Sequence, residues 1–149
     1  MSLEDLYREV ILDHYRSPRN RGELSDATVV VELNNPVCGD EIKLCLKVEN
    51  DTVNDVRFSG RGCSISQSSA SMMTEAVKGK PLSEALDMVE RFKAMMRSEI
   101  SADEANLGDL EALQGVSKFP VRIKCALLSW EALRQGLESE TAHVSGDIE

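Results

Sequence analysis

The sequence lacks the feature by which small zinc modules are usually recognised, a pair of cysteines two residues apart. Its 149 residues include four cysteines, and no two of them form a Cys-x-x-Cys knuckle, which excludes zinc ribbons and zinc fingers. Aromatic residues make up only 4% of the chain, so the core is predicted to consist of Leu, Val, Ile, Ala and Met. A chain of this length is predicted to fold as one domain without disulfide support.

Positive charge is also scarce, with 17 Lys and Arg residues against 26 Asp and Glu, which gives a formal net charge of −9. This balance disfavours nucleic acids and anionic membrane surfaces as partners. No apolar run is long enough to span a membrane, and residues 1–5 lack the basic start of a secretory signal. The protein is therefore expected to be cytoplasmic, where its cysteines would be reduced and would serve metal binding or thiol chemistry.

Three of the four cysteines lie in turn-like sequence, in the segments NPVCGD (35–40), GRGC (60–63) and RIKC (122–125). We interpret Cys38, Cys63 and Cys125 as one metal site assembled from three parts of the fold. Asp40 offers a fourth, harder ligand, although it could instead be only a turn residue after Gly39. Three thiolates and a carboxylate suit tetrahedral zinc, and iron could use the same set. The alternative is three buried free cysteines that act as small apolar residues, but the neighbouring Pro and Gly favour shaped loops.

The periodicity of apolar residues predicts an α+β fold. Strands are expected at 28–33, 41–48 and 52–58. A first helix is expected to end near residue 15, two more to cover about 64–78 and 83–97, and a last one to begin at Pro120. A short turn is expected at 107–113. The second and third strands form a hairpin that brings Cys38 and Cys63 to the same end. Cys63 would begin a helix, where free N–H groups favour its thiolate.

The predicted architecture is a small antiparallel three-stranded sheet with helices packed on one face and the metal site at one end of the sheet. Residues 1–137 are predicted to form the single domain. Residues 138–149 are polar and irregular in pattern, and they are predicted to be a disordered tail.

These motifs, together with HYRSPRNRG (14–22) and the extended segment PVRIKC (120–125), closely resemble the iron–sulfur cluster assembly proteins of the IscU/SufU family. The resemblance covers nearly the whole chain up to about Leu137. Scaffold-type members have a histidine directly before the third cysteine, where this chain has Lys124, and a shorter gap between the second and third cysteines. In both respects the sequence resembles the SufU branch of the family.

The resemblance implies a function and a set of roles. SufU-like members are zinc-bound sulfur acceptors that take persulfide sulfur from a cysteine desulfurase and pass it to downstream cluster assembly proteins; they are partners of that enzyme rather than stand-alone enzymes. Zn²⁺ would be held by Cys38, Asp40, Cys63 and Cys125, and a histidine of the desulfurase would displace one thiolate. Cys38 is the implied sulfur acceptor. Arg122 would support the liberated group or the docked partner, although it could be only a solvated helix residue.

Two other readings remain open. The chain could be a scaffold on which iron and sulfide form a [2Fe–2S] cluster, or, less favoured, a purely structural zinc module. Of the remaining polar residues, Cys45 lies on the strand face opposite Leu44 and is expected to be a bystander. His14 is expected to be packed and hydrogen-bonded. No functional role is predicted for His143, which lies in the expected tail. Lys124 cannot bind zinc while protonated, but its charge would favour nearby thiolates.

Overall fold

A computed structural model describes residues 3–139 and 142–148 of the chain as an α+β fold. The elements are α1 (Leu3–Arg16), β1 (Val29–Asn35), β2 (Asp40–Glu49), β3 (Thr52–Arg61), α2 (Ser64–Val77), α3 (Leu82–Met96), α4 (Ala102–Ala105), the 3-10 helix η1 (Gly108–Lys118), α5 (Pro120–Glu138) and β4 (His143–Asp147). None of the described helices is long and apolar enough to cross a membrane.

The sheet has four strands in the order β3-β2-β1-β4. Antiparallel pairing joins β1 to β2 and β2 to β3, as the alternating sequence predicts. The fourth strand pairs with β1 in parallel. The prediction of a three-stranded, purely antiparallel sheet is therefore wrong, and the sheet is mixed.

The additional strand comes from the segment 138–149, which the sequence predicts to be a disordered tail. Residues 143–147 instead lie in the sheet, and the half-buried Val144 and Ile148 pack against the core. The strand is short, polar and mostly exposed, so almost no apolar alternation marks it in the sequence. Its pairing with β1 depends on backbone hydrogen bonds, which side-chain patterns do not reveal.

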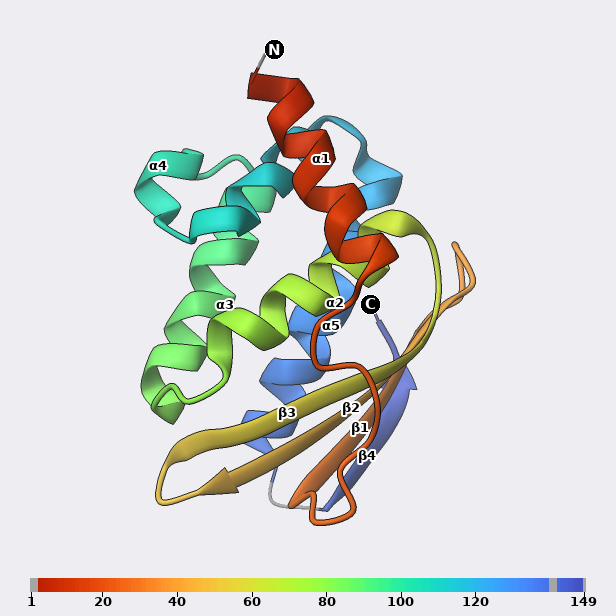
Figure 1. Ribbon diagram of the computed structural model, residues 1–149, viewed down its shortest axis with the longest axis vertical. Helices are drawn as coiled ribbons and strands as arrows, with labels where there is room; N and C mark the ends of the chain where they lie inside the picture. Colours follow the sequence, from red (N-terminus) through yellow and green to blue (C-terminus); the bar gives the residue numbers. More distant parts are fainter. Residues whose placement is uncertain (1–2, 140–141, 149) are drawn as a thin grey trace.

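The helices gather on one side of the sheet (Figure 1). The long α5 packs on β1 and β2, α2 packs on β3, and α1 lies outside them against α2 and η1. Gly136 permits the close approach of α5, because a Cβ atom there would lie 2.7 Å from a methyl carbon of Leu46. The core between the layers includes Trp130 stacked on Phe92, with ring centroids 4.7 Å apart.

The opposite face of the sheet is partly covered by the segment that joins α1 to β1. Glu23 and Asp26 of this segment form ion pairs with Lys43 and Lys47 of β2, at 2.7 and 2.8 Å. Cys45 lies between these two lysines along the strand and is buried. It is therefore on the far side of the sheet from the helices.

Candidate metal centre

Cys38 lies in the turn that joins β1 to β2. Asn35 and Asp40 face each other as the last pair of that hairpin, and the N–H of Gly39 donates to the carbonyl of Asn35 at 2.9 Å. Gly39 has a φ of +72°, a conformation that glycine adopts without steric cost. The turn therefore presents a half-buried Cys38 at the end of the sheet.

Asp40 connects this turn to the start of α2. Its Oδ1 accepts a hydrogen bond at 3.0 Å from the backbone N–H of Cys63, the residue that caps α2. Gly62 is needed for this contact, because a Cβ atom there would lie 2.5 Å from Asp40 Oδ1. The β2–β3 hairpin thus brings the segments of Cys38 and Cys63 to the same end of the sheet, as predicted.

Cys125 enters the site from the opening turns of α5, 87 positions along the chain from Cys38. Its side chain is fully buried, and its Sγ lies 3.4 Å from the Sγ of Cys38. One ligand atom from each of Cys38, Asp40 and Cys125 can be chosen so that all three lie within 4.8 Å of one another. Three of the four ligands predicted from the sequence are therefore side by side.

Two buried acceptor atoms test whether this cluster fits a metal ion. Among the residues that the structure describes, neither Asp40 Oδ2 nor Asn35 Oδ1 has a hydrogen-bond partner, and a buried unpaired acceptor is costly. Two thiols beside an unsatisfied carboxylate oxygen form a donor set that zinc and iron both accept. The residues fit a metal. Cys63 is outside the tight cluster, so the four-ligand set remains a prediction.

The protonation of Cys125 depends on the charges around it. Burial raises the pKa of the Cys125 thiol far above its ordinary value, and the neighbouring Cys38 and Asp40 raise it further. Cys125 is thus a neutral thiol unless positive charge is added, and a bound metal ion reverses this preference. The nearby sulfur of Cys125, followed by that of Cys63, raises the pKa of the exposed Arg122, so this guanidinium lies near the cysteines.

Residues that the sequence assigns away from the site are found elsewhere. Lys124 is exposed on α5, and Cys45 lies on the far face of the sheet. His14 is buried and its Nδ1 is 2.8 Å from Ser71 Oγ, which confirms the prediction of a packed, hydrogen-bonded histidine. His143 lies on β4, where its Nε2 is 2.8 Å from Glu32.

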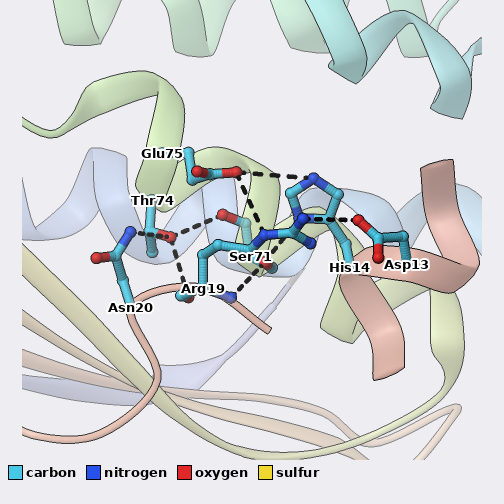
Figure 2. Close-up of polar contacts among 7 residues, drawn as sticks. All are labelled: Asp13, His14, Arg19, Asn20, Ser71, Thr74 and Glu75. Atoms are coloured by element: carbon cyan, nitrogen blue, oxygen red, sulfur yellow. Dashed lines mark hydrogen bonds and ion pairs between the residues drawn. The ribbon is translucent and has the colours of Figure 1, made fainter. Parts of the chain in front are cut away.

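His14 belongs to a polar network that fixes the segment after α1 to α2 (Figure 2). The Ser71 hydroxyl also accepts the backbone N–H of Arg19 at 2.9 Å, and the side chain of Asn20 donates to Thr74 at 3.1 Å. This network accounts for the sequence motif at 14–22 as a structural connection. Its histidine and carboxylates are not among the clustered ligands found in the described residues.

Sequence reasoning did not identify Asn35 as part of the site. It is completely buried, and its Nδ2 donates to the Sγ of Cys125 at 3.9 Å. The available signal was its position beside Pro36, at the start of the turn that carries Cys38.

Comparison with known proteins places this geometry in a family. The model of the NifU-like N terminal domain matches residues 6–137. The chain belongs to this family. A family member from Bacillus subtilis, named as the zinc-dependent sulfurtransferase SufU, is 56% identical over 93% of this chain and 94% of its own length. The iron–sulfur cluster assembly scaffold protein IscU of Streptococcus pyogenes serotype M1 is 44% identical over 91% of this chain and 85% of its own.

Solved structures agree with this placement. The crystal structure of a putative iron–sulfur cluster assembly scaffold protein for the SUF system from Fervidobacterium islandicum superposes with a TM-score of 0.83 at 34% identity, covering 92% of this chain and 100% of that one. A second crystal structure, of a hypothetical protein, has a TM-score of 0.84 at 44% identity and the same two coverages. The strand β4 lies beyond the residues that the family model matches.

Proposed function

We propose that this protein is a zinc-dependent sulfur acceptor in iron–sulfur cluster assembly. It would take persulfide sulfur from a cysteine desulfurase and pass it to downstream cluster assembly proteins. The observation that carries the proposal is the clustering of Cys38, Asp40 and Cys125 in a chain 56% identical to a protein named as a zinc-dependent sulfurtransferase. Residues 1–137 are proposed as the functional domain and the cytoplasm as its location.

Cys38, Asp40, Cys63 and Cys125 would hold the metal. When bound, Zn²⁺ supplies positive charge that keeps cysteine sulfur deprotonated near neutral pH. Cys63 would need to approach the other three, and its place at the N-terminus of α2 favours the thiolate form on its own. Iron is an alternative occupant, because thiolate and carboxylate ligands accept both ions.

Cys38 is the proposed acceptor, because it is on a turn and half-buried while Cys125 is enclosed in α5. Its thiolate attacks the terminal sulfur of the desulfurase persulfide. The S–S bond of that persulfide breaks as a new S–S bond forms on Cys38, and the desulfurase cysteine leaves as a thiolate. Any proton on the transferred sulfur moves with it, so the step is an exchange without net oxidation or reduction.

Arg122 is proposed to support this step. Its exposed guanidinium lies beside Cys125 and within electrostatic reach of Cys38 and Cys63. A cation at this position stabilises a thiolate or a newly formed persulfide anion while it is exposed to solvent. Lys124 adds a second positive charge on the same turn of α5.

A second candidate function is that of a scaffold on which iron and sulfide form a [2Fe–2S] cluster, with Asp40 completing the ligands. The 44% identity to a protein named as an IscU scaffold favours it. Lys124 disfavours it, because scaffold-type members have a metal-binding histidine at that position.

Metal analysis separates the two functions. Protein purified without oxygen would be assayed for zinc, iron and acid-labile sulfide, and then added to a cysteine desulfurase turning over cysteine. The proposal expects about one zinc per chain, no sulfide and strong stimulation of the desulfurase. Equal iron and sulfide with a visible charge-transfer colour, and no stimulation, would establish the scaffold function instead.

A further inference from the structure

Asn35 is a buried amide side chain that donates a hydrogen bond to a cysteine of the site. It ends β1 directly opposite Asp40, is 0% exposed, and donates from Nδ2 to Cys125 Sγ at 3.9 Å. Its neighbour Asn34 has the same side chain but points to the opposite side of the sheet, where it is exposed and donates to Asp147 at 3.5 Å. The two residues therefore form a natural comparison.

The Sγ atoms of Cys38 and Cys125 receive different hydrogen bonds from their surroundings. Cys125 is completely buried and receives the Asn35 donor. Among the described residues, the only hydrogen bond made to the Sγ of Cys38 comes from the thiol of Cys125 itself. Hydrogen bonds from an amide to a sulfur fix its orientation and withdraw electron density from it. The Sγ of Cys38, which receives no amide hydrogen bond among the described residues, is then more mobile and more nucleophilic than the Sγ of Cys125.

We infer that Asn35 is a positioning residue that fixes Cys125 in place and thereby directs incoming sulfur to Cys38. The inference rests on the proposed sulfur-acceptor function, because it explains which of two adjacent cysteines accepts the sulfur. Without the amide, Cys125 would lose its donor and could turn toward the position of Cys38, only 3.4 Å away. Sulfur would then be shared between the two cysteines.

The test compares the variants Asn35→Leu and Asn34→Leu with wild-type protein. Leucine has the same branched arrangement of side-chain heavy atoms as asparagine and can neither donate nor bind metal. At position 35 it also removes the unpaired Oδ1 acceptor, so the fold is expected to persist. Each zinc-loaded protein is incubated with a cysteine desulfurase and cysteine, alkylated and digested, and the sulfane sulfur on each cysteine is quantified by mass spectrometry.

Wild-type protein and Asn34→Leu should carry the added sulfur on Cys38 alone. Asn35→Leu should carry comparable amounts on Cys38 and Cys125, and its zinc affinity should fall by about 10–100-fold. After substitution with Co²⁺, the sulfur-to-metal charge-transfer bands should shift in Asn35→Leu and not in Asn34→Leu. A folded Asn35→Leu that labels only Cys38 and keeps the wild-type spectrum overturns the inference.

A second measurement needs no variant. In wild-type protein loaded with ¹¹³Cd, the side-chain amide protons of Asn35 should couple to the metal through the N–H···S hydrogen bond. Absence of this coupling in a fully loaded sample also overturns the inference. If instead wild-type protein accepts no sulfur on any cysteine, the proposed function fails, while the Co²⁺ and ¹¹³Cd results still decide whether Asn35 positions Cys125.

Discussion

Gly62 controls the position of the Asp40 carboxylate, so replacing it with alanine should damage the site without altering any ligand. An added Cβ atom would lie 2.5 Å from Asp40 Oδ1 and would also collide with Ser66 Oγ. The Ser66 hydroxyl can rotate away. The Asp40 carboxylate cannot move as freely, because it is buried and accepts the Cys63 N–H at 3.0 Å.

The size of the effect follows from what Asp40 must give up. A hydrogen bond to a charged group contributes about 1.5–3 kcal/mol, so Gly62→Ala should lower the free energy of unfolding of the metal-free protein by about 2 kcal/mol. For a chain of this size that corresponds to a loss of about 4–8 °C in Tm. Displacement of a ligand should weaken zinc binding by about 10–100-fold, as loss of an orienting partner does.

Thermal unfolding and competition for zinc with a chromophoric chelator measure both quantities. Gly115→Ala is the matched control, because no heavy atom lies within 4 Å of an added Cβ there, and it should leave Tm and zinc affinity unchanged. The backbone of Gly62 does not have a positive φ, so any loss comes from the collision and not from strain. A Gly62→Ala protein with wild-type zinc affinity and Tm would refute this account of Asp40.

Three further predictions follow from other residues. Cys38→Ala should abolish sulfur acceptance in the mass-spectrometric assay, whereas Cys45→Ala, on the far face of the sheet, should retain it; normal sulfur loading of Cys38→Ala would contradict the assignment. Gly136→Ala should lower the free energy of unfolding by about 1–3 kcal/mol, measured by urea denaturation, because the added methyl group overlaps Leu46. Burial, followed by the charge of Arg19, lowers the pKa of His14 below its usual 6.5, so the unfolded state binds more protons and stability should fall as pH drops below about 6.5; His14→Gln should flatten this dependence in denaturation curves collected across that range.

The sequence was sufficient to predict the convergence of the cysteine segments, because short-range patterns determine it. Alternation in β2 specifies which face is buried, and the turn that follows returns the chain as β3. Cys38 and Cys63 must then lie at one end of the sheet. The start of α5 at Pro120 could also be predicted, because proline is favoured in the first helical turn.

Features that depend on long-range pairing could not be predicted in this way. The strand β4 contains one half-buried apolar residue, Val144, and pairs with β1 through backbone hydrogen bonds and two exposed polar contacts, His143 with Glu32 and Asn34 with Asp147. The contact of Asn35 with Cys125 spans 90 positions, and no local pattern predicts which residue of α5 Asn35 meets. The helix α4 was missed despite a readable signal, since Ser101 and Glu104 form a capping box.

The separation of 87 positions between Cys38 and Cys125 affects how strongly the folded protein would resist unfolding and proteolysis. An ion that joins the β1–β2 turn to α5 would act as a removable cross-link around most of the domain. In the chain-entropy model, closing a loop of that length restricts the denatured chain by on the order of 4–5 kcal/mol. Loading and release of the ion would therefore change the resistance of the whole domain to unfolding and proteolysis, so that metal supply and protein lifetime would be linked through one contact.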